Sequence, residues 1–91
     1  MEYQYPMDFE WSTEEIVDVI HFFEAVEKAY ESKIQKEELM KAYRRFKEIV
    51  PGKADEKNYT DEFQKSSGYS AYQVIKAAKN AEDGAWIQLK K

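Results

Sequence analysis

The stretch from Trp11 to Tyr30 constrains the fold more than any other part of this 91-residue chain. Ser12 stands where a helix N-cap is expected, and Glu15, three residues later, completes a capping box that satisfies backbone N–H groups of the first turn. Beyond the cap, apolar residues recur every three or four positions, which is the spacing of one helix face. The stretch therefore predicts an amphipathic helix over residues 13–32, against which the rest of the chain packs.

Three further helices are predicted after the first. An apolar stripe at helical spacing predicts a second helix over residues 36–50, and Pro51-Gly52 ends it. A third, less apolar helix is predicted over residues 54–66, with Gly68 in a left-handed position after its end. Ser70, followed three residues later by a glutamine, is the predicted N-cap of a fourth helix. We therefore predict an all-α fold, a four-helix bundle-like array.

Both ends of the chain carry more apolar residues than chain termini usually do. Residues 1–11 alternate apolar and polar side chains, which is typical of an extended segment with one buried face, although Pro6 argues against a central strand. We predict an extended N-terminal arm laid across the helices. Residues 82–91 form a C-terminal tail, whose apolar segment Trp86–Leu89 either docks back on the domain or pairs with the arm. Residues 1–91 are predicted to be a single helical domain.

The composition argues against several classes of protein. The sequence has no cysteine, which excludes disulfides and thiolate metal sites and suits a reducing cytoplasm. The net charge is −4, with 12 acidic and 7 basic residues over positions 1–50 and 6 and 7 over positions 51–91, so neither half has the basic excess of a nucleic-acid binder. The acidic start lacks the pattern of a signal peptide, and no apolar run reaches the roughly 18 residues that span a membrane. We expect a cytoplasmic protein without membrane association.

Four stretches that cover most of residues 5–79 carry a family resemblance. They are Tyr5-Pro6, WSTEEIVDVIHFFEAVEKAYE, EELMKAYRRFKEIVPGKADEK and SSGYSAYQVIKAAK. Together they resemble a family of small proteins from bacillus-type bacteria that is catalogued only as an uncharacterised protein family. Residues 82–91 lie outside the resemblance. The resemblance implies a compact all-helical cytoplasmic protein. It implies no activity, cofactor or site residue, so none is carried over to this chain.

His21 is the single histidine of the sequence, with Asp18 three residues before it and Glu24 three residues after it. On a helix, Asp18 and His21 share a face, and such a pair is half of the ligand set of a di-iron bundle. The other half is missing, because the chain has no second histidine. No glycine-rich phosphate loop or nucleophile–histidine–acid series appears either. We therefore predict a surface histidine, no metal, no cofactor and no catalytic residue, so an enzyme is not expected.

The densest basic cluster lies on and just after the predicted second helix. Its members are Lys41, Arg44, Arg45, Lys47 and Lys53. Glu37 is spaced to pair with Lys41, and Arg44 is spaced to pair with Glu48, each four residues apart on one helix face. The favoured interpretation is a solvated helix face. The alternative is a docking patch for an acidic partner or RNA.

Residues 60–80 have the layout of a helix-turn-helix, with Gly68 in the turn. Gln73, Lys76 and Lys79 are spaced to face a nucleic-acid groove. Against this interpretation, the chain is acidic overall, and any helical hairpin with a short turn produces similar spacing. Nucleic-acid binding through this segment is therefore the alternative prediction and ranks below protein binding.

The aromatic residues are numerous for a chain of this length, with seven tyrosines and two tryptophans. Both residue types are favoured at interfaces because they combine apolar area with a polar group. The simpler explanation is that a small domain uses them to complete a thin core. We predict a small non-catalytic cytoplasmic protein-interaction or regulatory module that binds an unknown protein partner or a second copy of itself. The candidate partner surface is Tyr3, Tyr5, Arg44, Arg45 and Trp86.

Overall fold

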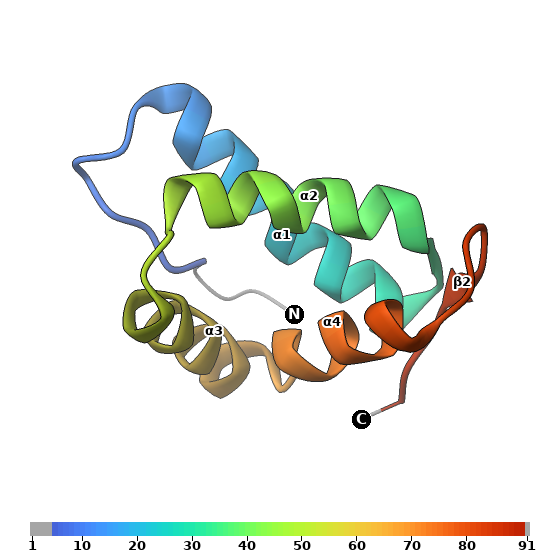
Figure 1. Ribbon diagram of the computed structural model, residues 1–91. Helices are drawn as coiled ribbons and strands as arrows, with labels where there is room; N and C mark the ends of the chain where they lie inside the picture. The colour runs from blue at the N-terminus through green and yellow to red at the C-terminus, as the bar shows by residue number, and fades with distance from the viewer. Residues whose placement is uncertain (1–4, 91) are drawn as a thin grey trace.

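The computed structural model describes residues 5–90, and within that range it consists of four helices and two very short strands (Figure 1). In chain order the elements are α1 (Thr13–Glu31), β1 (Ile34–Gln35), α2 (Lys36–Ile49), α3 (Lys53–Ser67), α4 (Ala71–Asn80) and β2 (Trp86–Ile87). The predicted all-α fold with four helices is confirmed. The ends of the first three helices lie within one residue of their predicted positions.

Local capping explains where the helices begin and end. Ser12 Oγ accepts a hydrogen bond from the Glu15 N–H (3.2 Å), and Glu15 Oε1 accepts one from the Ser12 N–H (2.8 Å), so the predicted capping box is confirmed. Gly68 has a left-handed φ of 81° after α3, a conformation that residues with a Cβ rarely adopt. Ser70 Oγ caps α4 by accepting a bond from the Gln73 N–H (3.2 Å).

A cluster of four phenylalanines forms the centre of the core. Phe22 and Phe23 of α1, Phe46 of α2 and Phe63 of α3 are each at most 1% exposed. The ring centroids of Phe22 and Phe46 are 4.6 Å apart, and those of Phe23 and Phe63 are 4.5 Å apart. Burying one such ring contributes roughly 1.5–3 kcal/mol, so this cluster holds three helices together.

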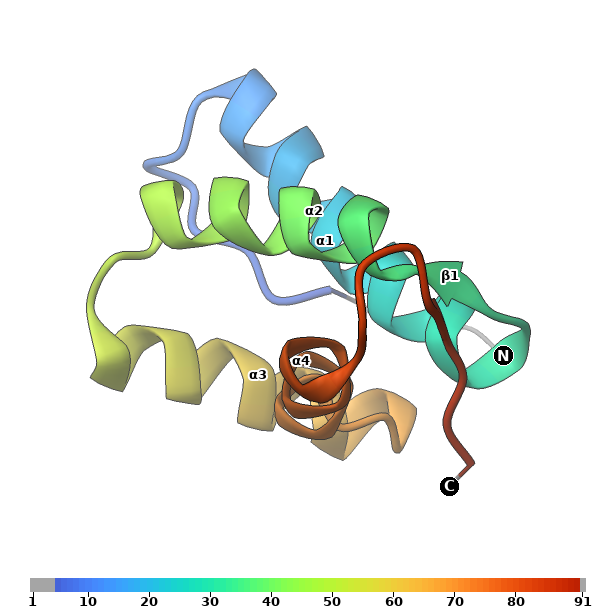
Figure 2. The same cartoon turned by 45° about the vertical axis from the view of Figure 1, so that its right-hand side comes forward.

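The helices form two layers. Figure 1 shows α1 and α2 side by side in one layer, with α3 and α4 in the other. Figure 2 looks nearly along α4 while α3 crosses the view, so the two helices of the second layer meet at a steep angle. The Cα radius of gyration is 12.4 Å. None of the described helices is both long and apolar enough to cross a membrane.

The N-terminal arm enters between the two layers. The Tyr5 ring stacks on Phe23 of α1 and Phe63 of α3, with centroid distances of 6.3 and 6.0 Å, and Pro6 is buried beside it. The Tyr5 hydroxyl donates a hydrogen bond to Glu27 Oε1 (2.6 Å). Burial, together with nearby carboxylates, raises the pKa of Tyr5, so its hydroxyl stays a neutral donor near pH 7.

The arm turns before it reaches α1. The Trp11 N–H donates to the Asp8 carbonyl oxygen (3.1 Å), and the Glu10 N–H donates to Asp8 Oδ1 (2.9 Å). The Trp11 ring then packs on Tyr59 of α3, with centroids 5.2 Å apart. The extended part of the arm therefore ends at Asp8. Residues 8–10 then form a turn, which is held by the buried Pro6 before it and by the Trp11 ring after it.

The C-terminal tail docks back on the domain, which is one of the two alternatives that the sequence left open. β2 pairs antiparallel with β1, with Ile87 opposite Ile34. Ile34 is fully buried and Ile87 is 4% exposed, so the pair adds to the core rather than to the surface. Beyond β2, the Leu89 N–H donates to the Ala29 carbonyl oxygen of α1 (2.9 Å). The tail therefore closes over the end of α1.

The connection between α4 and β2 is fastened to the first turn of α2. Lys36 Nζ donates to the Ala81 carbonyl oxygen (2.6 Å) and lies 3.7 Å from Asp83 Oδ1. Glu37 Oε2 accepts a hydrogen bond from the Gly84 N–H (2.8 Å), and this bond lowers the pKa of Glu37. The tail is therefore held by backbone pairing on one side and by two charged side chains on the other.

Candidate functional site

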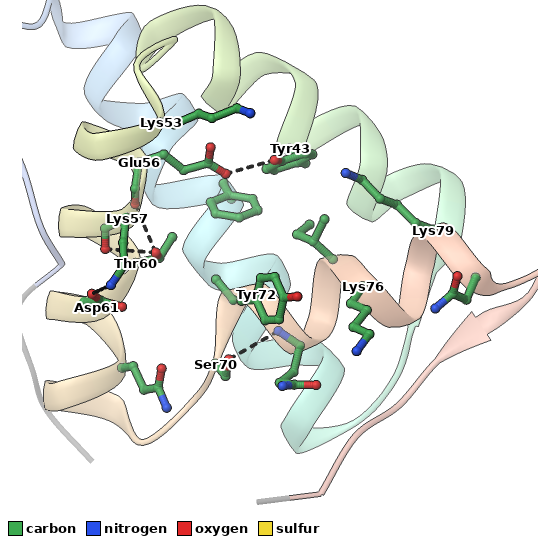
Figure 3. Close-up of a pocket in the computed structure, with 16 residues that line it drawn as sticks. Tyr43, Lys53, Glu56, Lys57, Thr60, Asp61, Ser70, Tyr72, Lys76 and Lys79 are labelled. Carbon is green, nitrogen blue, oxygen red and sulfur yellow. Dashed lines mark hydrogen bonds and ion pairs between the residues drawn. The ribbon is translucent and has the colours of Figure 1, made fainter.

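An open groove with a volume of about 900 Å³ lies between α2, α3 and α4. Figure 3 shows α2 above the groove, α3 at its left and α4 below it. The groove is bounded by α3 and α4, which leave the turn at Gly68 in different directions (Figure 2). Its walls therefore come from three helices that the phenylalanine cluster and the α4 core residues keep in place.

The floor of the groove is apolar. Phe22, Ala71 and Ile75 contribute to it and are at most 7% exposed. The Tyr43 ring lies beside Phe22, with centroids 5.7 Å apart, and forms the upper wall. A side chain that enters the groove would therefore contact residues already fixed by core packing, which limits the conformational entropy lost on binding.

A half-buried polar network lies at the upper end of the groove. The Tyr43 hydroxyl donates to Glu56 Oε2 (2.9 Å), and Lys47 Nζ lies 2.6 Å from Glu56 Oε1. Burial and the bond to Glu56 raise the pKa of Tyr43 to about 12, so the phenol is neutral near pH 7. Both carboxylate oxygens of Glu56 are thus occupied, and the network joins α2 to α3.

The rim of the groove is basic. Lys53, Lys57, Lys76 and Lys79 line it, and its second carboxylate, Asp61, is already bound by Lys57 at 2.9 Å. Among the residues that the structure describes, no carboxylate forms an ion pair with Lys53, Lys76 or Lys79. The groove therefore carries three ammonium groups whose charge is not balanced locally.

Tyr72 adds an exposed aromatic ring to the groove. Its side chain is 68% exposed on α4, one helical turn before Lys76 (Figure 3). On the opposite side, Lys79 Nζ lies 5.8 Å from the centroid of the Tyr43 ring. Apolar floor, exposed ring and unbalanced ammonium groups together suit a chain segment that carries both carboxylates and an apolar side chain.

Two aliphatic hydroxyl groups line the groove, and both form hydrogen bonds within α3 or α4. Thr60 Oγ1 donates to the Glu56 carbonyl oxygen (3.0 Å) one turn earlier in α3. Ser70 Oγ accepts the capping bond of α4. Neither hydroxyl lies beside a histidine or an unbound carboxylate that would take its proton. Both hydroxyls are therefore engaged by local bonds within α3 and α4.

His21 lies outside the groove, on α1. It is exposed and lines a shallow depression of about 550 Å³ between α1 and α2. Asp18, its predicted partner on the helix face, is bound instead by Arg45 Nε at 2.7 Å. Within residues 5–90, no group of three or more histidine, aspartate or glutamate side chains is arranged to hold a metal ion.

The predicted partner surface occupies other parts of the molecule. Tyr3 lies outside the described residues, and Tyr5 packs between α1 and α3. Arg44 is exposed on α2, and Arg45 pairs with carboxylates of α1 and α2. Trp86 is 55% exposed on β2. None of the four described members lines the groove, and their role in partner binding stays a prediction.

The ion pairs of α2 differ from those predicted by four-residue spacing. Glu37 binds the loop after α4 instead of Lys41, and Glu48 pairs with Arg45 at 3.3 Å instead of Arg44. The first predicted pair is wrong because spacing along one helix cannot represent a backbone N–H that arrives from another element. The second is wrong because Arg45, three residues before Glu48, shares its helix face and binds it instead. Exposed pairs gain little energy, so a backbone N–H or a carboxylate of a neighbouring helix competes successfully.

Part of the groove can be predicted from the sequence. Gln73, Lys76 and Lys79 were predicted to share an exposed face, and all three line the groove. Tyr72 was missed, although its four-residue spacing from Lys76 places both on that face. The sequence places Lys53 only in the basic cluster that follows the second helix, and no local pattern signals that it faces α4 across the groove.

Comparison with known proteins gives close relatives over almost the whole chain. Residues 2–87 match the model of an uncharacterised protein family, UPF0223. A UPF0223 protein of Bacillus pumilus (strain SAFR-032) is 57% identical over 89 residues, which cover 98% of this chain and 100% of that protein. The UPF0223 protein YktA of Bacillus subtilis (strain 168) is 60% identical over 82 residues, which cover 90% of this chain and 93% of that protein.

Proposed function

This chain belongs to the UPF0223 family, whose function is uncharacterised, and we propose that it is a non-catalytic protein-interaction module. The groove between α2, α3 and α4 would take an acidic segment of another protein chain. The observation that carries the proposal is the rim, where Lys53, Lys76 and Lys79 stand over an apolar floor without an ion-pair partner among the described residues.

The charge of the groove is opposite to that of the whole chain. The net charge of the protein is −4, whereas four lysines and two carboxylates line the groove. An acidic partner is therefore attracted to this face and repelled by most of the remaining surface, which favours one orientation of encounter. Three ammonium groups around an apolar floor also disfavour basic segments, so the groove selects by sign of charge.

Two observations support binding without chemistry. The hydroxyls of Thr60 and Ser70 are engaged by their own helices. The Tyr43 phenol, with a pKa of about 12, stays protonated near neutral pH and does not act as a base there. We also propose a cytoplasmic location, which fits a chain without cysteine.

Affinity capture with matched charge variants tests the proposal. Wild-type protein is immobilised and exposed to a lysate of a bacillus-type bacterium beside the double variant Lys76→Glu plus Lys79→Glu. The control is Lys65→Glu plus Lys90→Glu, which changes the net charge equally at two exposed lysines outside the groove. We expect the wild type and the control to retain the same acidic partner and the groove variant to lose it.

The behaviour of the groove variant and the effect of salt decide whether the groove is the binding site. A partner that the groove variant also retains would place binding elsewhere and overturn the groove as the site. Retention that falls steeply with added salt supports the basic rim, because screening weakens exposed charge interactions. Circular dichroism on each variant ensures that loss of binding does not reflect loss of fold.

A second candidate function is nucleic-acid binding through α3 and α4. The observation in its favour is that Gln73, Lys76 and Lys79 lie exposed on one face of α4, after a turn and a steep crossing of two helices. A mobility-shift assay with random DNA and RNA at low salt addresses it. Tight binding that weakens in the groove variant would place this function above protein binding.

A further inference from the structure

We infer that the occupant of the groove is a second copy of this chain, which inserts the turn of residues 8–10 between α3 and α4. The inference rests on the proposed function, because it uses the same groove. It begins from Phe9, whose side chain is 98% exposed at the tip of that turn. A phenylalanine so fully exposed is unusual in a domain this small, since leaving its ring in water forgoes the burial energy of a large apolar side chain.

The turn holds Phe9 away from the domain. On one side Pro6 is buried, and on the other the Trp11 ring packs on Tyr59 of α3. Between these anchors, the Asp8 carbonyl and carboxylate oxygens accept bonds from two backbone N–H groups of the turn. Because the turn is fixed at both sides, little conformational entropy is lost when its ring enters a partner surface.

The charges of the turn and the groove are complementary. Glu10 follows Phe9 directly, and Glu14 lies in the first turn of α1. Both side chains are exposed, and neither forms an ion pair with another described residue. The groove carries the opposite charge, because lysines surround Tyr72 and the apolar floor. The Phe9 ring fits beside Tyr72 while its neighbouring carboxylates meet the lysines.

One copy cannot fill its own groove. The turn is attached to α3 through Tyr59, whereas the groove is lined by the other side of α3, at Lys57, Thr60 and Gln64. In Figure 1 the segment before α1 lies at the upper left of the molecule, whereas α4 lies at the lower right. The ring must therefore enter the groove of another copy. Since turn and groove are different patches, every copy offers one of each.

Sedimentation velocity over a wide range of protein concentration tests the inference. We expect the wild type to associate as concentration rises. Phe9→Ala should weaken association by roughly thirtyfold, the equivalent of about 2 kcal/mol for an aromatic anchor. Lys76→Glu plus Lys79→Glu should weaken it similarly from the other side. Val17→Ala truncates another exposed apolar residue, 43% exposed on α1, and should leave association unchanged.

A mixing experiment identifies the contact. Phe9→Ala keeps an intact groove, and Lys76→Glu plus Lys79→Glu keeps an intact turn. At a protein concentration near the wild-type dissociation constant, each variant alone should be largely monomeric. An equal mixture should form a one-to-one complex and nothing larger, because only one contact can then be made. A mixture that stays monomeric while the wild type associates would overturn the contact between turn and groove.

A wild type that stays monomeric at every concentration would overturn the second copy as occupant. The proposed function is then examined separately by titrating the protein with a short peptide in which glutamates flank one phenylalanine. Amide chemical-shift changes confined to the groove residues of α2, α3 and α4 would keep the groove as a site for a foreign acidic chain and still refute self-association. No change at the groove would refute both proposals.

Discussion

Tyr5 near the N-terminus and Ile87 near the C-terminus both reach the hydrophobic core, but different contacts hold them there. Tyr5 is held by its side chain, through ring contacts with Phe23 and Phe63 and a hydrogen bond to Glu27. Ile87 is held by the backbone, through the antiparallel pairing of β2 with β1. A side-chain anchor fixes one residue, whereas strand pairing fixes the orientation of its neighbours as well.

This difference explains why Phe9 and Trp86, the two exposed aromatic residues near the chain ends, are exposed for different reasons. Trp86 precedes Ile87 in β2, so strand alternation directs it outward once Ile87 points inward. Lys33 Nζ also lies 4.6 Å from its ring centroid. Strand alternation does not direct Phe9 outward, because Phe9 lies in a turn whose anchors at Pro6 and Trp11 hold it away from the domain. The exposure of Phe9 is therefore the more informative of the two.

Removing the side-chain anchor should have the largest effect. Tyr5→Ala should lower the free energy of unfolding by about 3 kcal/mol, since it leaves space between two buried rings and removes the donor to Glu27. Urea denaturation measures the change. Tyr5→Phe is the matched control, because it keeps the ring and should cost only about 1 kcal/mol. Equal losses in both variants would mean that the hydrogen bond, not the ring, holds the arm.

Weakening the backbone-held end should cost less. Ile87→Ala should lower stability by about 2 kcal/mol, at the low end for a buried isoleucine because a chain end relaxes easily. Hydrogen exchange at the Leu89 amide, bonded to Ala29, should quicken before exchange in α1. Gln88→Ala, at an exposed position, is the control. Simultaneous quickening in tail and helix would show that the tail is not a separate cooperative unit.

Acid should release the tail before the arm. The Gly84 N–H lowers the pKa of Glu37 below its ordinary 4.5, so Glu37 stabilises the docked tail above that pH. This contribution is lost as pH falls through the lowered pKa. Fluorine NMR with fluorotryptophan gives one signal from each end, and the Trp86 signal should move in this window. Glu37→Gln should remove the transition, and an unchanged transition in that variant would assign it to another carboxyl group.

Alkaline pH should loosen the N-terminal arm before the C-terminal tail. Burial raises the pKa of Tyr5 and of Tyr59 above 10.0, so their contribution is complete below pH 10 and is lost as pH rises through the raised values. The Trp11 signal, which comes from a ring packed on Tyr59, should therefore shift before that of Trp86. Tyr5→Phe plus Tyr59→Phe should abolish the difference. A persistent early shift would point to another tyrosine.

The exposed aromatic residues should have the smallest effects on stability. Phe9→Ala and Trp86→Ala should each change the free energy of unfolding by no more than about 0.5 kcal/mol, because neither side chain contributes to the core. Thermal unfolding provides the measurement. The two variants should nevertheless differ in sedimentation, where only Phe9→Ala weakens association. Equal weakening would remove the distinction between a ring that alternation exposes and a ring that the turn exposes.

Much of the fold could be predicted from the sequence, because its helix ends are encoded locally. Ser12 and Glu15 determine the start of α1 within four residues of chain, and Gly68 determines the end of α3 through one dihedral angle. The pairing of Ile34 with Ile87 could not be predicted in the same way. Each strand has two residues, which is too short for an alternation pattern, and the partners are distant in the sequence.

The candidate site shows the same limit. The face of α4 that carries Lys76 and Lys79 follows from helical spacing alone. The width of the groove depends on the angle between α3 and α4, which the turn at Gly68 permits but does not specify. Arg45 illustrates the point for charges, since it binds Asp18 on α1 as well as its own helix neighbour. Contacts between elements require the packed structure.

The pairing of β1 with β2 has a consequence for the order in which the chain can fold. Synthesis proceeds from the N-terminus, so α1, β1 and α2 exist before β2 has been made. During that interval Ile34, which is fully buried in the finished protein, lacks its partner Ile87 and exposes an apolar strand edge. A protein that ends before Ile87 keeps that edge open permanently, so truncation at the tail creates a site for aggregation even when all four helices are intact.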